Sequence, residues 1–223
     1  MKQVYARPKC LKDAHFHYCP GCGHSIIHRL LAEVIDEHNL RDNTICVGPA
    51  GCGMLLYNYL DIDAVESAHG RGAAVATGIK RVRPDALVFS YQGDGDLAAI
   101  GTAESFHAAN RGENITVIFV NNGVYGMTGG QMAPTTLLEQ VTTTSPAGRA
   151  AHREGYPVRM CEILALLQGT SYLERVTVNK PSAVIKAKKA IARAFEHQAK
   201  KTGFSMVEIL SMCPTNWKMG VME

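Results

Sequence analysis

Two stretches of the sequence decide the fold: Ala86-Leu87-Val88-Phe89-Ser90-Tyr91-Gln92-Gly93-Asp94-Gly95-Asp96 and Ile115-Thr116-Val117-Ile118-Phe119-Val120-Asn121-Asn122-Gly123. Each begins with an apolar run of strand length and ends in glycine beside carboxylate or carboxamide side chains. Such uninterrupted apolar runs are typical of parallel strands that are buried on both faces. We therefore predict an α/β protein with an open, mainly parallel sheet and helices on both faces.

The rest of the chain alternates in the same way. Strands are predicted at 44–47, 86–91, 115–120, 172–178 and 204–210, and helices at 25–39, 70–80, 97–110, 161–167 and 181–200. Residues 125–156 are rich in glycine, threonine and proline, and we expect a long ordered loop there. Loops of this length inside a compact domain are usually functional. A chain of 223 residues is long enough for one α/β domain and short for two, so we expect a single domain spanning residues 1–223.

Composition narrows the function class. The net charge is only +3 at pH 7, and no basic stripe with interleaved aromatic residues occurs, so we expect no nucleic-acid partner. Residues 1–12 contain no apolar run that could act as a signal peptide, and no segment reaches membrane-spanning length. The odd number of cysteines, seven, argues for a reducing compartment, where thiols bind metal rather than pair. We expect a cytoplasmic protein that does not enter membranes.

The candidate ligands follow the predicted strands. They are Cys52 after the strand ending at Val47, Gly93-Asp94-Gly95 after Tyr91, Asn121-Asn122 after Val120, and Cys213 after Leu210. Ligands bind at the carboxyl ends of strands in open parallel sheets. We therefore interpret these motifs as parts of one site.

Two kinds of metal chemistry are indicated. The Asp94 carboxylate, the Asn122 amide oxygen and a backbone carbonyl just beyond it suit a hard cation held against a diphosphate, which glycine lets the backbone approach. This pattern resembles the metal–diphosphate motif of thiamine-diphosphate enzymes. The thiols suit an iron–sulfur cluster or zinc, and Cys19-Pro20-Gly21-Cys22 by itself is also compatible with a redox pair.

The order of the motifs is more specific than any one of them. The series runs Cys19-Pro20-Gly21-Cys22-Gly23-His24, Gly51-Cys52-Gly53, His69-Gly70-Arg71, Gly93-Asp94-Gly95-Asp96, Asn121-Asn122-Gly123-Val124-Tyr125-Gly126-Met127-Thr128-Gly129-Gly130-Gln131 and Cys213-Pro214-Thr215-Asn216-Trp217. From Tyr18 to Trp217 the chain resembles the β subunit of 2-oxoacid:ferredoxin oxidoreductases.

The resemblance implies a thiamine-diphosphate-binding fold and a set of ligands. A [4Fe-4S] cluster would be held by Cys19, Cys22, Cys52 and Cys213, and Mg²⁺ by Asp94, Asn122 and the Val124 carbonyl. His69 and Arg71 would be catalytic, with Arg71 meeting a phosphate or a substrate carboxylate. The implied cofactor-binding residues are Gly51, Gly53, His69, Gly70, Arg71, Gly93, Asp94, Gly95, Asp96, Asn122, Val124, Tyr125, Gly126, Met127 and Thr128. Cys46 and Cys161 are expected in the core, and His28 and His107 in structural roles.

The implied reaction is the oxidative decarboxylation of a 2-oxo acid to an acyl-CoA and CO₂, with electrons passing through the cluster to ferredoxin or a ferredoxin-like subunit. Coenzyme A and the aminopyrimidine-binding half would come from an α subunit, in an αβ unit or larger. The segment Thr142-Thr143-Thr144-Ser145-Pro146-Ala147-Gly148-Arg149 resembles β subunits of the 2-oxoglutarate or branched-chain 2-oxoacid type. Two alternatives remain open from the residues: a non-redox thiamine-diphosphate decarboxylase or synthase subunit with a cysteine-ligated structural metal, and a non-enzymatic metal module.

Overall fold

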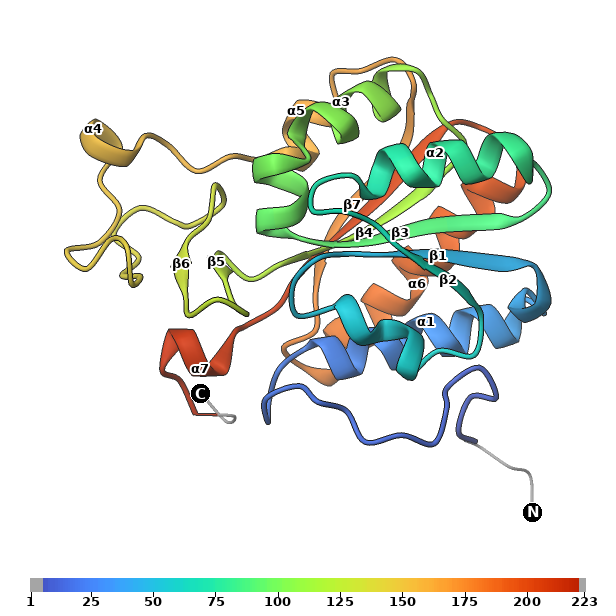
Figure 1. The fold of residues 1–223 in the computed structure, drawn as a ribbon, viewed down its shortest axis with the longest axis horizontal. Helices are drawn as coiled ribbons and strands as arrows, with labels where there is room; N and C mark the ends of the chain where they lie inside the picture. Colours follow the sequence, from blue (N-terminus) through green and yellow to red (C-terminus); the bar gives the residue numbers. More distant parts are fainter. Residues whose placement is uncertain (1–5, 221–223) are drawn as a thin grey trace.

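A parallel sheet of six strands forms the centre of the molecule, in the order β2-β1-β3-β4-β8-β7 (Figure 1). The computed structural model describes residues 6–220, so the ends of the predicted domain, 1–5 and 221–223, lie outside the described residues. The strands are β1 (Thr44–Gly48), β2 (Asp63–Glu66), β3 (Leu87–Gly93), β4 (Thr116–Asn121), β7 (Thr170–Thr177) and β8 (Phe204–Leu210). The predicted α/β fold with a parallel sheet is confirmed.

Helices cover both faces of this sheet (Figure 1). Helices α1 (His24–Glu37) and α6 (Pro181–Ala199) lie on one face, and α2 (Gly72–Val82), α3 (Thr102–Asn110) and α5 (Met160–Leu164) on the other. Because strand side chains point to alternate faces, β4 serves both layers: Ile118 packs in the α1–α6 cluster and Phe119 in the opposite one. Both side chains are fully buried, as the unbroken apolar run predicts.

Helix α6 shows how local sequence and packing agree. Pro181 occupies its first turn, where the fixed φ of proline suits a helix and the missing N–H needs no partner. Its buried residues recur every three or four positions and are mostly small: Ala183, Ala187, Ala190, Ile191, Ala194, Phe195 and Gln198. The alanines let the helix axis approach the sheet closely, and Phe195 fills the remaining space against Phe89.

Two elements differ from the prediction. Strand β2 was not predicted, because all four of its residues are exposed at the sheet edge and show no apolar alternation. The predicted helix at 97–110 is interrupted: a π-helical turn, η3 (Gly95–Ile100), precedes α3. Gly101 separates the two, and a Cβ there would stand 2.4 Å from the Asp96 carbonyl oxygen and 2.8 Å from that of Gly70. This contact brings the Gly70 loop against the first turn after β3.

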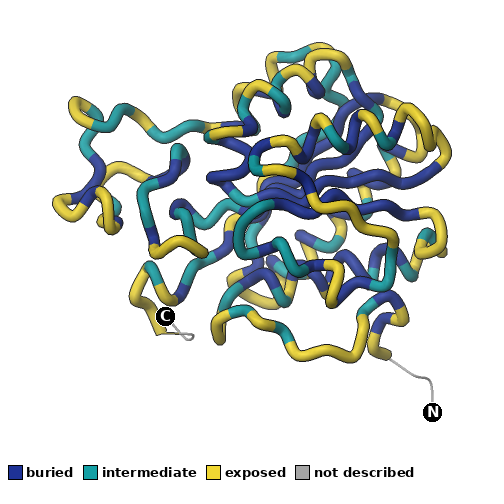
Figure 2. The backbone as a smooth tube through the Cα atoms, viewed as in Figure 1, coloured by how far each residue is buried: buried dark blue, intermediate teal, exposed yellow. Residues whose placement is uncertain are grey.

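The predicted loop at 125–156 is largely irregular and projects from the sheet layers (Figures 1 and 2). Its regular elements are the short pair β5 (Val124–Tyr125) and β6 (Gln131–Met132) and the helix α4 (Ala151–Glu154). We call residues 131–158 the arm. The buried guanidinium of Arg149 holds it together by donating to the carbonyls of Ala133, Pro134, Thr136, Glu154, Gly155 and Tyr156 at 2.8–3.3 Å. One arginine side chain thus provides hydrogen-bond donors for these carbonyl groups of the arm.

The remaining elements are short: η1 (Arg41–Asn43), η2 (Met54–Asn58) and α7 (Pro214–Trp217). Within residues 6–220, no helix combines the length and apolar character needed to cross a membrane.

Candidate active site

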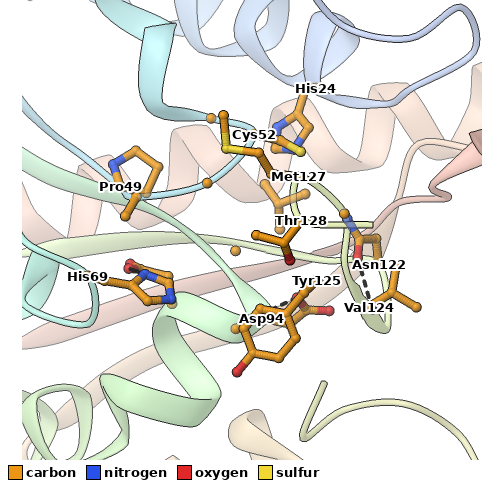
Figure 3. Close-up of a pocket in the computed structure, with 18 of the residues that line it drawn as sticks. His24, Pro49, Cys52, His69, Asp94, Asn122, Val124, Tyr125, Met127 and Thr128 are labelled. Carbon is orange, nitrogen blue, oxygen red and sulfur yellow. Dashed lines mark hydrogen bonds and ion pairs between the residues drawn. The ribbon is translucent and has the colours of Figure 1, made fainter. Parts of the chain in front are cut away.

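A cavity of about 290 Å³ opens where β1, β3 and β4 end (Figure 3). It is lined by the segments that follow these strands, and it contains most of the predicted site residues. These are Gly51, Cys52, Gly53, His69, Gly93, Asp94, Gly95, Asp96, Asn122, Val124, Tyr125, Gly126, Met127 and Thr128. These residues therefore meet at one sheet edge as predicted, whereas the predicted site residues Cys19, Cys22, Gly70, Arg71 and Cys213 do not line the cavity.

Asp94 is a buried carboxylate with no cationic side chain paired to it in the described part of the chain. One carboxylate oxygen accepts from the Gly95 N–H at 2.8 Å, and the other accepts from the Thr135 hydroxyl at 3.2 Å. Burial raises the pKa of Asp94 to about 6, although these donors and the amides of Gly123 and Asn122 favour the charged form. A buried anion that faces a cavity and lacks a counter-charge is a fitting ligand for a cation.

The turn after β4 supplies further oxygens. The Asn122 side-chain oxygen accepts from the Val124 N–H at 3.1 Å, and both residues line the cavity. Gly123 between them has φ +71°, which explains glycine at this position. At Gly93, which ends the neighbouring strand β3 and pairs with Val120, a Cβ would meet no atom within 4 Å. The wall is therefore open where a diphosphate has to approach the backbone, and the donor set of Asp94, Asn122 and Val124 fits Mg²⁺.

Asp96 acts on His69. Its carboxylate accepts from His69 Nδ1 at 2.6 Å, from the Gly70 N–H at 2.8 Å and from Gln92 Nε2 at 2.6 Å. A carboxylate that accepts this hydrogen bond places a proton on Nδ1 and leaves Nε2 without a partner in this contact. Because Asp96 is 1% exposed and both of its oxygens are engaged, it holds the imidazole in one tautomer beside the cavity.

Arg71 is directed away from the cavity. Its guanidinium donates to the Glu104 carboxylate and to the Ile100 carbonyl at 3.3 Å, and both acceptors belong to the η3–α3 region. The structure does not bring Arg71 to the other predicted site residues. The predicted contact of Arg71 with a phosphate or substrate carboxylate stays a prediction, and in this arrangement Arg71 is paired with Glu104 instead.

The thiols of distant segments approach one another. The sulfurs of Cys52 and Cys213 lie 3.4 Å and 3.6 Å from the point where a Cβ on Gly126 would stand. Burial, followed by the neighbouring Cys22, Cys213 and Cys19, raises the pKa of Cys52 to about 11. Crowded thiols disfavour their own ionisation unless a metal compensates the charge. This donor chemistry fits an iron–sulfur cluster. Among residues 6–220, however, no three or more His, Cys, Asp or Glu side chains are arranged so that they could hold a metal ion.

The cysteines and histidines for which structural roles are predicted lie outside the cavity lining. Cys46 is buried in the core, and Cys161 is half-buried and packs against the α2–α3–α5 cluster. Cys10, for which no role was predicted, is also buried in the core. His28 is fully buried, with Nε2 2.6 Å from the Tyr18 hydroxyl. His107 lies in the last turn of α3.

Two residues of the site were not predicted. His24 lines the cavity, where its Nδ1 lies 2.6 Å from the Tyr91 hydroxyl, and burial followed by the nearby His17 lowers its pKa to about 4. Its position directly after the first cysteine pair was the available signal. Thr135 donates to Asp94 from the arm, forty-one residues along the chain, and nothing in the local sequence indicates that contact.

Comparisons with known proteins agree with this geometry. Residues 52–209 match the family model described as thiamine pyrophosphate enzyme, C-terminal TPP binding domain. The ketoisovalerate oxidoreductase subunit VorA of Methanothermobacter thermautotrophicus is 52% identical over 96% of this chain and 47% of that protein. The 2-oxoglutarate synthase subunit KorB of Methanocaldococcus jannaschii is 38% identical over 89% of this chain and 69% of that protein.

A solved structure shares the fold. It is a 2-oxoglutarate:ferredoxin oxidoreductase from Magnetococcus marinus with 2-oxoglutarate, coenzyme A and succinyl-CoA bound. The two superpose with a TM-score of 0.83 at 30% identity, over 96% of this chain and 70% of that one. The chain spans about half the length of the VorA relatives that it matches.

Proposed function

This chain belongs to the 2-oxoacid:ferredoxin oxidoreductases, among the subunits that carry the thiamine pyrophosphate-binding domain, and on that premise we propose that it forms half of an active site for oxidative decarboxylation of a 2-oxo acid to an acyl-CoA. The observation that carries the proposal is that the Asp94 carboxylate and the Cys52 thiol line the same cavity. A hard-cation site beside a cluster of thiols suits a reaction that both removes CO₂ and transfers electrons. The relatives named as oxidoreductases support this function and not the non-redox alternative.

We assign the cofactor contacts from the cavity wall. Mg²⁺ would be held by Asp94, Asn122 and the Val124 carbonyl, with the open backbone at Gly93 available to the diphosphate. The further contacts proposed are Gly51, Gly53, His69, Asp96, Tyr125, Gly126, Met127 and Thr128, all of which line the cavity. Tyr125 packs directly over Gly95, where a Cβ would stand 2.2 Å from its ring, so the tyrosine closes the wall behind the diphosphate.

Bound thiamine diphosphate supplies the electron sink for decarboxylation. The chain's own contribution is to orient the substrate, exclude water and handle protons. His69 is suited to the last task because the Asp96 carboxylate holds its Nδ1 at 2.6 Å and leaves Nε2 beside the cavity to accept or donate a hydrogen bond. The thiols of Cys19, Cys22, Cys52 and Cys213 would hold a [4Fe-4S] cluster that passes electrons singly to ferredoxin or a ferredoxin-like subunit.

The role of His69 can be tested through Asp96. In Asp96→Asn, the amide can present either its oxygen or its N–H₂ to Nδ1 and no longer fixes one tautomer of His69, so we expect kcat to fall by about tenfold to a hundredfold. The KM for the 2-oxo acid and the affinity for thiamine diphosphate should change less than kcat, because the oxygens of Asp96 are engaged by His69, Gly70 and Gln92 and asparagine keeps the shape of this part of the cavity wall. Steady-state kinetics of the complete enzyme and equilibrium dialysis measure these quantities.

Glu104→Gln is the matched control for Asp96→Asn. It removes a carboxylate that pairs with Arg71 outside the cavity, and its kcat should stay at the wild-type value. An unchanged kcat in Asp96→Asn, or an equal loss in both variants, would refute a proton-handling role for His69.

A partner subunit is part of the proposal. No glutamate lines the described cavity, and thiamine enzymes use a glutamate to activate the aminopyrimidine ring. That group, together with much of the coenzyme A site, would therefore come from a second subunit that covers the sheet edge. The named relatives are themselves subunits, which supports an αβ unit or a larger assembly.

We therefore expect this chain alone to show no turnover. Purified alone, it should not reduce ferredoxin or a viologen dye in the presence of a 2-oxo acid and coenzyme A. Co-expression with a cognate α subunit should restore the reaction, because the activating glutamate is then supplied. Robust turnover by the chain alone would contradict the half-site argument, and no turnover by any reconstituted complex would contradict the proposed function itself.

We propose a branched-chain 2-oxo acid as the substrate. The residues lining it include no lysine or arginine, so this chain offers no cation to a second carboxylate such as that of 2-oxoglutarate. Pro49, Ala50, Val120 and Met127 supply apolar surface instead. The higher identity to the ketoisovalerate relative supports the same choice. Comparing kcat/KM of the reconstituted complex for ketoisovalerate and 2-oxoglutarate tests it, and a preference for 2-oxoglutarate would overturn it.

A further inference from the structure

The short helix α7 joins the thiol site to the turn that carries the metal oxygens. It begins immediately after Cys213 and lies beside β5 and β6 (Figure 1). The indole N–H of Trp217 donates to the Asn122 carbonyl at 2.9 Å. The Asn216 amide N–H₂ donates to the Gly126 carbonyl at 3.1 Å and to the Cys213 sulfur at 3.2 Å. One helical turn therefore contacts Cys213 three residues away and the segment 122–126 about ninety residues away.

The packing here is close enough to restrict movement. Gly130 has φ +81°, and a Cβ on it would stand 2.6 Å from the Asn216 side-chain oxygen. The loop thus accepts α7 only because glycine is present at the contact. The Gly130 N–H also bonds to the Tyr125 carbonyl at 2.8 Å, which closes the loop that α7 contacts. A displacement of α7 would therefore also displace residues 122–130.

Two hydrogen bonds engage different oxygens of Asn122, in the turn that carries the proposed Mg²⁺ ligands. Trp217 engages the main-chain oxygen of Asn122, whereas the side-chain oxygen of Asn122 accepts from Val124 within the turn. The Trp217 indole therefore holds the backbone of Asn122 and does not engage its side-chain carboxamide, which stays on the cavity side. Mg²⁺ requires near-ideal octahedral geometry at about 2.0–2.1 Å, so small displacements of this backbone weaken binding.

We propose that Asn216 and Trp217 are positioning residues that couple occupation of the thiol site to cofactor binding at the Asn122 turn. The inference rests on the proposed function. When Cys213 is held as a ligand, α7 is held as well, and Asn216 and Trp217 keep the turn in its binding geometry. Coupling between two binding sites is reciprocal, so a bound cofactor also strengthens retention of the thiol-bound metal.

The test uses the complex assembled with its partner subunit. Equilibrium dialysis measures the affinity for thiamine diphosphate at saturating Mg²⁺, with the iron site loaded or emptied by a chelator. We expect iron removal to weaken wild-type affinity by about tenfold, the effect of one lost hydrogen bond of ~1.4 kcal/mol. Iron-loaded Trp217→Phe, which keeps an aromatic ring but loses the donor, should bind about tenfold more weakly with its iron content unchanged.

Asn216→Ala supplies the decisive comparison. Its cofactor affinity should be low with iron present and should not fall further when iron is removed, because the link is already broken. Thr215→Ala is the control on the same helix, since Thr215 is exposed, and it should behave as wild type. Wild-type affinity in both Trp217→Phe and Asn216→Ala, or an equal response of Asn216→Ala to iron removal, would overturn the coupling. If loaded wild-type complex binds no thiamine diphosphate, the proposed function fails as well.

Discussion

Replacing Asp94 with alanine is expected to abolish binding of thiamine diphosphate and leave the iron content intact. The variant removes the only carboxylate proposed as a Mg²⁺ ligand and leaves phosphate charge uncompensated in a partly dry site. Breaking a buried ion pair by removing one partner costs about 3–5 kcal/mol. At a factor of ten per 1.4 kcal/mol, this corresponds to a loss of affinity of about a hundredfold to a few thousandfold. Equilibrium dialysis of the complex and an iron assay measure the two effects.

The neighbouring Asp96 provides the comparison for this result. Asp94→Ala should lose the cofactor, whereas Asp96→Asn should keep the cofactor and lose turnover, although the two carboxylates are two positions apart. The cofactor-free Asp94→Ala protein should not melt at a lower temperature than wild type, because burial already disfavours the Asp94 charge. Unchanged affinity in Asp94→Ala would show that the Gly-Asp-Gly turn holds no metal.

Replacing Cys213 with serine is expected to remove the iron and the broad visible absorbance. A [4Fe-4S] cluster needs about four thiolate ligands, and a serine hydroxyl is a harder donor that ionises far less readily. Because Cys19, Cys22 and Cys52 lie toward the other end of the chain, the loss would show that both ends share one centre. Iron analysis and absorbance of anaerobically purified protein provide the measurement.

Cys161→Ser is the matched control. Cys161 is also partly buried, but burial and the adjacent Glu208 carboxylate raise its pKa, and it is remote from the thiol site in the described contacts. It should retain iron at the wild-type level. Equal loss of iron from both variants, or from neither, would be incompatible with the proposed ligand set, and zinc in place of iron would favour a structural metal.

The layered fold and the place of the site are both predictable from the order of residues. Strands β3, β4 and β8 could be predicted because their apolar runs must be buried on both faces, and motifs after parallel strands must meet at one edge. That argument is sufficient to bring Asp94 and Asn122 together at one edge of the sheet. Helix α6 was equally clear from its initial proline and apolar spacing. These are local signals, in which the physical cause lies within a few residues of its effect.

The tertiary structure determines the partner of each side chain. Arg71 and His69 are two residues apart, yet one pairs with Glu104 outside the cavity and the other is held beside the cavity by Asp96. The different surroundings of these two side chains depend on the close approach of the Gly70 loop to Gly101. No periodicity in the sequence predicts that contact. Strand β2 was missed because an exposed edge strand needs no apolar pattern. The contacts of Thr135 and Trp217 join segments brought together only when the whole sheet has formed, because hydrogen-bond geometry depends on positions in space and not on sequence spacing.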